Sequence, residues 1–298
     1  MRVLLTGATG FVGGYACSEI LAKGWELRVL VRKNSGNLEV LPEKAEKCFG
    51  GLKFESESET AKILRGVDAV IHNGYCHDID ELVDPLGFFE NNVRGTFRFI
   101  EFSRRQGVKQ FVFVSSKAAY GSAPAGKITD EAAVCRPDGE YGAYKAAIDA
   151  YVYAMAKELN FNICSLRLGW VYGIFRDYRR MAFYKETKQI TENSRAVKLE
   201  GSFDLVNALD AAKAMVFVLG NKNVKGEIYN VLNDKSTTAL SMGKYVKELC
   251  GSKSRLTGAT ASSSRTGNEK FRKLGFKFSN TEGVREYLSR LVGLAGQH

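Results

Sequence analysis

The sequence has no hydrophobic run long enough to span a membrane, and we expect no apolar leader. No apolar stretch reaches the roughly 18 residues of a membrane-spanning helix. The segment that precedes Gly7 is too short to hold the apolar core of a signal peptide. These absences lead us to expect a cytoplasmic protein that does not enter a membrane.

Residues for metal and disulfide chemistry are scarce. The chain has three histidines, and no two of its six cysteines are close enough in sequence to form a CxxC motif. We expect six reduced thiols, mostly as small core residues, and no metal site. The cysteines are Cys17, Cys48, Cys76, Cys135, Cys164 and Cys250.

Excess positive charge is missing from the first half of the chain. Residues 1–150 carry 19 basic and 20 acidic side chains, whereas residues 151–298 carry 24 and 13. The net charge of +10 therefore comes from the second half, which carries +11. Such an excess fits an anionic substrate, a nucleic acid or a solvated surface. Because no motif combining aromatic and basic residues accompanies it, we expect no nucleic acid partner.

The sequence does contain a regular alternation of short apolar runs and longer amphipathic stretches. The apolar runs predict strands at 2–6, 27–31, 67–72, 110–114, 162–168 and 227–232. The amphipathic stretches predict helices at 11–23, 88–106, 141–159, 207–219 and near 281–291. This order indicates βαβ units, and so an α/β fold with a doubly wound parallel sheet. Segments 55–59 and 262–266, rich in serine and charge, are expected to be surface loops.

Three glycines follow the first expected strand and open the first expected helix. Glycine permits a tight turn and lets the backbone approach a pyrophosphate, which then meets the free amides of the helix N-terminus. We therefore predict a Rossmann-type dinucleotide site. The residues expected to line its phosphates are Gly7, Thr9, Gly10, Phe11, Val12 and Gly13.

The acid that usually follows the second strand of a NAD site is absent. Arg32 and Lys33 stand there instead. A guanidinium can pair with a ribose 2′-phosphate, which a carboxylate would repel. We therefore favour NADP(H) as the cofactor and keep NAD(H) open, because Arg32 could also stack on adenine or lie in solvent.

The segment TGATGFVG at residues 6–13 resembles the opening of the extended short-chain dehydrogenase/reductase superfamily, in particular its NAD-dependent epimerase/dehydratase family. Further matching segments are DAVIHNG at 68–74, NVRGT at 92–96, SSKAAYG at 115–121, YGAYK at 141–145 and RLGWVYG at 167–173. The resemblance implies a Rossmann-type domain, which we place in residues 1–173 plus 204–232. It also implies a small, discontinuous substrate-binding domain, which we place in 174–203 plus 233–298.

The motif Tyr-x-x-x-Lys occurs three times, and the resemblance singles out one copy. Tyr141, with Lys145, lies 25 residues beyond Ser116, which suits the spacing of the family. The resemblance implies that Tyr141 is the general acid/base, that Ser116 orients the same substrate oxygen, and that Lys145 holds the nicotinamide ribose. We expect the Lys145 charge to lower the tyrosine pKa from about 10. The other copies, expected to be packing or surface residues, are Tyr153 with Lys157 and Tyr184 with Lys188.

The remaining cofactor contacts rest on the resemblance alone. Where the family often has Gly-Asp-Leu near the third strand, this chain has Gly50-Gly51-Leu52, so only the Leu52 backbone is left to meet adenine. Asn92 is expected to tie a central helix to the active-site strand, and His72 to be a core histidine. The implied contacts, besides Tyr141 and Lys145, are Leu52, Asn73, Gly74, Asn92, Ser115, Leu168 and Val171.

These motifs do not name a substrate, and several functions stay open. Lys117 and Ala118 follow Ser116 where sugar-nucleotide dehydratases carry an acidic pair, so we set dehydration aside. Trp170 stands where nucleotide-sugar epimerases often have asparagine, which weakens a nucleotide-sugar substrate without excluding it. We favour an NAD(P)-dependent oxidoreductase that interconverts an alcohol and a carbonyl of a small molecule. The alternatives are a nucleotide-sugar epimerase with tightly bound NAD and a non-enzymatic dinucleotide sensor or RNA-binding relative.

Two further expectations concern the substrate charge and the assembly. Basic residues after the sheet domain could clamp an anionic substrate or lie in solvent. By analogy with the extended branch we expect a homodimer formed by helices 88–106 and 141–159, with Tyr151, Tyr153 and Met155 on its surface. The basic residues are Arg176, Arg179, Arg180, Lys185 and Lys188.

Overall fold

The chain divides into two compact units, each built from three separate stretches. The first contains Met1–Ser122, Ala133–Arg167 and Ala212–Tyr229, and the second contains Ala123–Ala132, Leu168–Ala211 and Asn230–His298. The structure is a computed structural model. The residues that it describes are 1–33, 35, 37–76, 83–122, 127–175, 179, 181–233, 236–259, 265–278 and 283–296.

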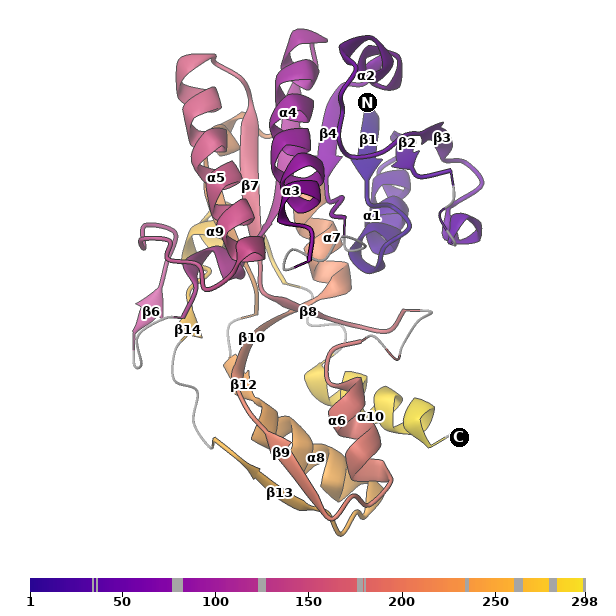
Figure 1. Cartoon of the computed structure of the whole chain (residues 1–298), viewed down its shortest axis with the longest axis vertical. Coiled ribbons are helices and arrows are strands. Elements are labelled where there is room, and N and C mark those ends of the chain that lie inside the picture. The colour runs from indigo at the N-terminus through magenta and orange to yellow at the C-terminus, as the bar shows by residue number, and fades with distance from the viewer. Residues whose placement is uncertain are drawn as a thin grey trace. The chain divides into compact units, whose positions relative to one another are not determined.

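A seven-stranded sheet forms the centre of the first unit (Figure 1). Its order is β11-β7-β5-β4-β1-β2-β3, and β1 pairs in parallel with both β2 and β4. Val3, Leu4 and Leu5 of β1 are fully buried, as expected for a central strand covered on both faces. The predicted α/β sheet is therefore confirmed. Its strands are β1 (Arg2–Thr6), β2 (Glu26–Val31), β3 (Glu46–Phe49), β4 (Ala69–His72), β5 (Gln110–Ser116), β7 (Ile163–Leu168) and β11 (Ile228–Val231).

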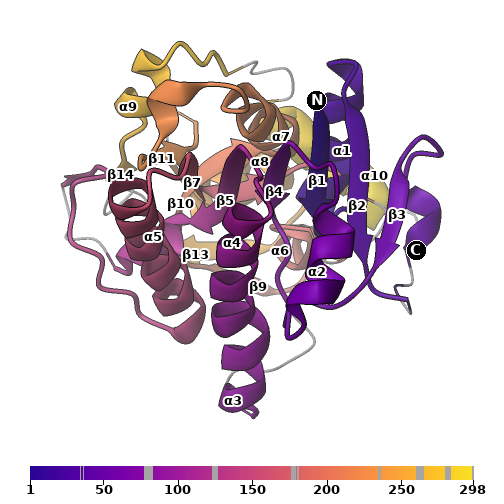
Figure 2. The ribbon, with the colours of Figure 1, turned by 90° about the horizontal axis from the view of Figure 1, so that it is seen from above.

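Helices cover both faces of this sheet. Figure 2 shows α2, α4 and α5 on one face and α1 and α7 on the other. On the first face, the ring centroids of Phe99 in α4 and Phe111 in β5 lie 5.6 Å apart, and Ile148 of α5 is fully buried in the same core. The helices are α1 (Phe11–Ala22), α2 (Glu57–Leu64), α4 (Gly95–Arg105), α5 (Glu140–Glu158) and α7 (Ala208–Phe217).

The single helix expected at 88–106 is divided into three parts. A short α3 (Pro85–Phe88) runs into a π-helical segment (Phe89–Arg94), and regular α-helix resumes at Gly95. Gly95 lies so close to the loop after β3 that a Cβ there would be 1.9 Å from the carbonyl oxygen of Leu52. The apolar spacing of the sequence did not reveal this change of helical geometry, because it depends on a backbone contact with a distant segment.

The expectation of a loop at 55–59 is wrong, because α2 begins there. The Ser56 hydroxyl accepts a hydrogen bond from the Glu59 amide at 3.2 Å, which caps the helix N-terminus. Thr60 and Leu64 are buried and hold the helix on the sheet. The serine that indicated a loop is thus the start signal of a helix.

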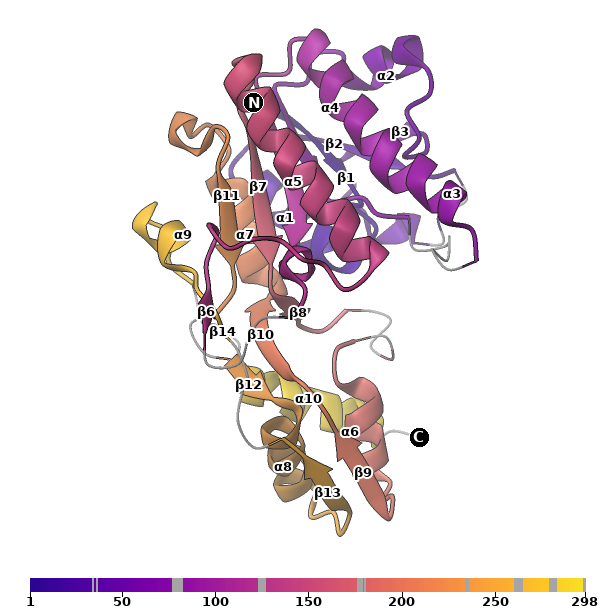
Figure 3. The ribbon, with the colours of Figure 1, turned by 60° about the vertical axis from the view of Figure 1, so that its left-hand side comes forward.

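Small sheets and short helices make up the second unit. β10 (Ser202–Asn207) pairs antiparallel with β12 (Ser236–Thr238) and parallel with β8 (Trp170–Tyr172). Figure 3 shows α6, α8 and α10 gathered beside β9 and β13, and Tyr287 and Leu291 of α10 are buried in the core that they share. The other elements of this unit are β6 (Ile128–Thr129), α6 (Tyr184–Thr191), β9 (Ala196–Leu199), α8 (Ala239–Cys250), β13 (Arg255–Gly258), β14 (Arg265–Thr266), α9 (Glu269–Lys273) and α10 (Val284–Ala295).

The observed division differs from the expected domain boundaries at four places. Residues 230–232, at the end of the expected large-sheet domain, lie in the second unit. Residues 168–173 and 204–211 were also expected with the large sheet but lie in the second unit. They do so because β8 and β10 pair with each other, with Val171 opposite Val206. Residues 123–132 also join the second unit, where β6 pairs with β14.

None of the helices in the described part of the chain is long and apolar enough to cross a membrane. The same residues include no group of three or more histidine, cysteine, aspartate or glutamate side chains arranged to bind a metal ion.

Candidate active site

The glycine loop joins β1 to α1 at the carboxyl edge of the parallel sheet. Gly7 has a left-handed backbone with φ of 71°, and a Cβ on Gly13 would lie 2.0 Å from the Gly7 carbonyl oxygen. Gly10 is the N-cap of α1, and no side chain among the described residues caps this helix. The first amides of α1, from Phe11 and Val12 onward, are thus available to an anion, and the loop fits a dinucleotide pyrophosphate.

The ends of the neighbouring strands close in on this loop. A Cβ on Gly7 would lie 2.8 Å from the carbonyl oxygen of Asn73. Gly74 also has no room for a side chain, because a Cβ there would lie 2.8 Å from Thr6 Oγ1 and 3.1 Å from a Leu52 methyl carbon. The structure therefore brings together three of the predicted cofactor contacts, Leu52, Asn73 and Gly74, beside the glycine loop.

His72, the last residue of β4, is a buried side chain at the carboxyl edge of the sheet. Its Nδ1 lies 2.8 Å from Thr6 Oγ1 and its Nε2 lies 3.0 Å from Thr96 Oγ1. The Thr96 hydroxyl donates to the Asn92 carbonyl oxygen at 2.7 Å, so it accepts from His72, which assigns the proton of the neutral ring to Nε2. Burial, with the nearby charge of Lys145, lowers the pKa of His72 to about 3. The prediction of a core histidine is confirmed.

Ser116 and Tyr141 meet at the end of β5. Their side chains are hydrogen-bonded, and Ser116 Oγ also accepts from the Ala118 amide at 3.2 Å. The Tyr141 ring is half-buried and packs edge-on against Tyr75, with ring centroids 5.1 Å apart. Burial raises the pKa of Tyr141, and the hydrogen bond with Ser116 offsets only part of that effect. The expected lowering of this pKa by Lys145 is therefore not found.

Lys145 is a buried amine one helical turn beyond Tyr141. Its side chain is 5% exposed, its Nζ donates to the Val114 carbonyl oxygen at 2.7 Å, and the same nitrogen lies 5.6 Å from the centroid of the Tyr141 ring. Burial lowers the pKa of Lys145 to about 7, against the attraction of Asp149. A lysine that loses half its charge near neutral pH is a weak electrostatic influence on its tyrosine neighbour, which explains the missing effect.

The stability of the protein is expected to depend on this lysine and on pH. Because the unfolded chain binds the lysine proton with a pKa of 10.5 and the folded protein with a pKa of about 7, the charge destabilises the fold fully below pH 7. The penalty fades as pH rises toward 10.5. We expect Lys145→Met to raise the free energy of unfolding by roughly 2–3 kcal/mol at pH 6, where relief of the penalty exceeds the loss of the hydrogen bond. Near pH 10, where mainly the lost hydrogen bond counts, the same change should lower it by about 1 kcal/mol. Urea denaturation at both pH values measures this, and a gain independent of pH would contradict it.

Asp149, one helical turn after Lys145 in α5, is at the centre of a buried polar cluster. It is 1% exposed, and its carboxylate accepts hydrogen bonds from Arg167 Nε at 2.6 Å, from the Ser115 hydroxyl at 3.1 Å and from the Ser165 hydroxyl. Burial raises the pKa of Asp149, and Arg167 opposes this shift. The sequence analysis missed Asp149 and Arg167, although Asp149 stands four residues after Lys145, on the same helix face. The Ser115 hydroxyl, expected at the cofactor, instead faces the protein interior.

Arg32 and Lys33 lie at the carboxyl end of β2. Both are exposed and directly follow β2, whose Leu30 is in register with Thr6 of β1. Ser35 lies 3.4 Å from the Thr9 hydroxyl of the glycine loop. The segment after β2 therefore runs beside the loop, as a dinucleotide site requires.

Other predicted site residues fall outside this group. Asn92 lies on the π-helical segment, where its Oδ1 accepts from the Cys76 amide at 2.8 Å, so it positions the loop after β4. Leu168 and Val171 belong to the second unit. Tyr153 is 57% exposed and Tyr184 is buried in the second core, in keeping with the surface and packing roles expected of these Tyr-x-x-x-Lys copies. Arg176 and Arg180, two of the basic residues expected near an anionic substrate, lie outside the described residues.

Known proteins resemble this chain along most of its length. Residues 3–231 match the model of the NAD dependent epimerase/dehydratase family. An uncharacterized UDP-glucose epimerase of Bacillus subtilis, YtcB, is 27% identical over 276 residues, which are 86% of this chain and 84% of that protein. The sterol demethylase protein B of Methylococcus capsulatus is 25% identical over 253 residues, 84% of this chain and 75% of that protein.

The fold has a solved counterpart as well. The crystal structure of Thermus thermophilus UDP-glucose 4-epimerase in complex with NAD superposes with a TM-score of 0.82 and 25% sequence identity. The match covers 98% of this chain and 99% of that one. The similarity therefore includes both the large sheet and the second unit.

Proposed function

The chain belongs to the NAD-dependent epimerase/dehydratase family, and on that premise we propose that it is an NAD(P)-dependent oxidoreductase of the extended short-chain type. Its reaction interconverts an alcohol and a carbonyl by hydride transfer. The observation that supports this most directly is the hydrogen-bonded pair of Ser116 and Tyr141 beside the buried amine of Lys145. The glycine loop at the same sheet edge supplies the matching dinucleotide site.

The chemistry of the proton follows from the side chains. A bound nicotinamide dinucleotide supplies or accepts the hydride at the substrate carbon. In reduction, the Tyr141 hydroxyl donates its proton to the substrate carbonyl oxygen, and the Ser116 hydroxyl donates a hydrogen bond to that oxygen. Because burial raises the pKa of Tyr141, the tyrosine is protonated at neutral pH. This favours its role as the acid in carbonyl reduction over its role as the base in alcohol oxidation.

The proposal is tested by turnover with reduced cofactor. The purified protein is incubated with NADPH or NADH and a panel of aldehydes and ketones, and loss of the reduced nicotinamide is followed by absorbance. We expect consumption that depends on both the cofactor and the carbonyl compound. Interconversion of UDP-sugars without net loss of cofactor would instead identify an epimerase.

We propose NADP(H) as the preferred cofactor, because two cations stand where NAD sites usually carry an acid. In Arg32→Ala we expect affinity for NADPH to fall about tenfold or more, roughly 1.4 kcal/mol, with little change for NADH. Fluorescence titration of cofactor-free protein with both nucleotides measures this. Lys47→Ala, which removes an exposed lysine of β3, is the matched control and should change neither affinity. Equal losses for NADPH and NADH in Arg32→Ala would assign Arg32 to the adenine or the pyrophosphate.

An epimerase that holds NAD tightly is the second candidate. Relatives named as UDP-glucose epimerases, matched over most of the chain, favour it. Such an enzyme uses the same serine, tyrosine and lysine, with transient oxidation of a sugar carbon. Mass spectrometry of the nucleotide released on denaturation separates the candidates, since retained NAD supports the epimerase and exchangeable NADPH the oxidoreductase.

We propose a homodimer formed through α4 and α5. Tyr153 and Leu159 on and just after α5 are 57% and 47% exposed, and Tyr151 packs on Phe97 of α4 with ring centroids 4.3 Å apart. Met155, expected on this surface, is instead 4% exposed and belongs to the core. Light scattering after gel filtration gives the oligomeric state, and a monomer at working concentration would reject the proposal.

A further inference from the structure

Four aromatic rings lie close to the buried amine of Lys145. Its Nζ is 4.6 Å from the ring centroid of Phe113 and 4.8 Å from that of Tyr144. It is 5.6 Å from the centroid of Tyr141 and 5.9 Å from that of Tyr75. All four distances are within the roughly 6 Å over which the face of a ring attracts a cation. We call these four rings the aromatic cage.

The aromatic cage lies entirely within the first unit, and its rings pack on one another. Its members are Phe113 of β5, Tyr141 and Tyr144 of α5, and Tyr75 of the segment after β4. Phe113 packs edge-on against Tyr144, with ring centroids 5.9 Å apart. Tyr75 lies 5.1 Å from Tyr141 and 6.0 Å from Tyr144, measured in the same way. The rings therefore support one another through contacts that do not involve the amine.

The titratable groups around Lys145 offer its ammonium form little attraction from a full negative charge. Asp149 stands one helical turn away, but its carboxylate is paired with Arg167 at 2.6 Å. His72 is neutral at physiological pH, because its pKa is lowered to about 3. Burial raises the pKa of both cage tyrosines of α5, so they are protonated as well. The faces of the rings are therefore a major source of attraction for the lysine charge.

The hydrogen bonds of the amine also leave room for the rings. An ammonium ion has three N–H donors, and the described residues accept from one of them, at the Val114 carbonyl oxygen 2.7 Å away. The Tyr144 hydroxyl is engaged with Thr96, whose Oγ1 lies 3.2 Å away. N–H groups form weak hydrogen bonds with the faces of aromatic rings. The ring faces of the cage thus stand where the remaining donors need partners.

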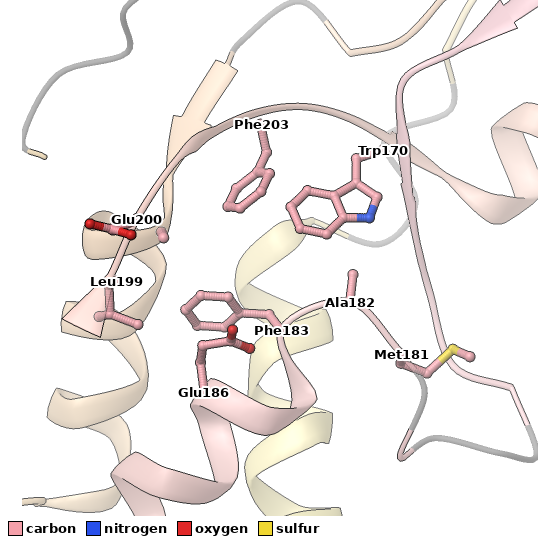
Figure 4. Close-up of a pocket in the computed structure, with 9 residues that line it drawn as sticks. Trp170, Met181, Ala182, Phe183, Glu186, Leu199, Glu200 and Phe203 are labelled. Atoms are coloured by element: carbon pink, nitrogen blue, oxygen red, sulfur yellow. The ribbon is translucent and has the colours of Figure 1, made fainter. Parts of the chain in front are cut away.

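Another aromatic cluster of the chain provides a contrast. In the second unit, aromatic rings line a cavity of about 240 Å³ (Figure 4). The ring centroids of Trp170 and Phe203 are 3.9 Å apart there, and Figure 4 shows the Phe183 ring facing this pair. No described residue that lines this cavity is basic. The aromatic cage of the first unit differs from this cluster in having a buried amine among its rings.

We propose that three rings of the aromatic cage are positioning residues for Lys145, because they stabilise its ammonium form and hold it beside Tyr141. These residues are Phe113, Tyr144 and Tyr75. Burial favours loss of the lysine proton, and the negative faces of the rings oppose that loss without the cost of a second buried carboxylate. The inference rests on the proposed function only for the task of this cation, which is to bind the nicotinamide ribose.

The test compares two ring deletions in β5 by urea denaturation at pH 6 and pH 10, with neither cofactor nor turnover. Phe113→Leu removes a ring of the cage. Phe111→Leu, the matched control, removes a ring that is equally buried and stands two residues earlier in the same strand. Both variants lose packing at both pH values. Because folded Lys145 is largely charged at pH 6 and neutral at pH 10, only Phe113→Leu should lose a further attraction at pH 6.

We expect the equilibrium constant for unfolding to rise about fivefold more at pH 6 than at pH 10 in Phe113→Leu. In Phe111→Leu the rise should be the same at both pH values. A double-mutant cycle with Lys145→Met isolates the contribution of the charge, and in that background the additional rise at pH 6 should disappear.

A second position repeats the test where Phe113→Leu does not fold. Tyr75 is half-buried, so Tyr75→Leu disturbs the core less, and Tyr75→Phe, which keeps the ring, should restore the pH dependence of the unaltered protein. Equal effects of the leucine variants at both pH values would overturn the proposal, and so would an additional rise at pH 6 that persists with Lys145→Met. Absence of carbonyl reduction with the expected pH dependence intact would reject only the proposed reaction.

Discussion

Replacement of Tyr141 by phenylalanine is expected to lower kcat for carbonyl reduction by about 10²–10⁴-fold, the usual contribution of a positioned general acid. The change removes only the hydroxyl that is hydrogen-bonded to Ser116. The ring, and with it the edge-on contact with Tyr75, is retained. We therefore expect the affinity for the dinucleotide and the melting temperature to stay close to those of the unaltered protein. Steady-state kinetics with saturating cofactor measure the loss.

The chain supplies a matched control for this variant. Tyr153 stands on the same helix in another Tyr-x-x-x-Lys copy, with the Lys157 Nζ 6.0 Å from its ring centroid, but it is 57% exposed. Tyr153→Phe should leave kcat unchanged. An equal loss in both variants, or full activity in Tyr141→Phe, would remove Tyr141 from the mechanism. Lost dinucleotide binding in Tyr141→Phe would assign the tyrosine to cofactor binding rather than to proton transfer.

Replacement of Asp149 by asparagine is expected to lower the free energy of unfolding by about 3–5 kcal/mol, because it leaves a buried guanidinium without its counter-charge. The Arg167 and Asp149 side chains are 4% and 1% exposed, and the distance from Arg167 Nε to Asp149 Oδ2 is 2.6 Å. Asparagine keeps the shape of the side chain and so preserves the packing. The loss of unfolding free energy therefore measures the contribution of the Asp149 charge. Urea denaturation measures the change. Removing the attraction of Asp149 should also lower the pKa of Lys145 further.

Glu101 provides a matched control for Asp149, because it forms ion pairs with arginines at the protein surface. It binds two arginines, Arg104 and Arg105, each at 2.8 Å, but these side chains are 32% and 51% exposed. Because exposed ion pairs stabilise proteins by about 0–1 kcal/mol, Glu101→Gln should cost less than about 1 kcal/mol. Similar losses in the two variants would show that burial does not set the contribution of Asp149, and a loss below about 1 kcal/mol in Asp149→Asn would contradict the expectation.

The features that the sequence predicted well are those fixed by neighbouring residues in the chain. The glycine loop needs only Gly7 and Gly10 between a strand and a helix and Gly13 in the first turn of that helix, and the structure contains this arrangement. Tyr141 and Lys145 share a helix face because of their spacing alone. The choice of Tyr141 over Tyr153 needed the spacing to Ser116. In the structure Ser116 at the end of β5 and Tyr141 in α5 are hydrogen-bonded.

The features that the sequence did not reveal depend on contacts between distant segments. Arg167 lies near Asp149 only because β7 packs against α5, and a lone arginine in a strand carries no such signal. The same holds for the π-helical segment 89–94, where the Asn92 side chain bonds the Cys76 backbone. The electrostatics were missed for a related reason, since the pKa of Lys145 is set by burial, which spacing does not measure.

The chain passes between its two units five times before it ends, and this has a consequence for its synthesis. The stretch that completes the first unit, Ala212–Tyr229, comes after Leu168–Ala211 of the second. During translation, β7 therefore lacks its outer neighbour β11 until most of the polypeptide has left the ribosome. An uncovered strand edge invites pairing with other chains, so the nascent protein passes through a prolonged stage in which it needs protection. Neither unit corresponds to a contiguous fragment that could be expressed alone.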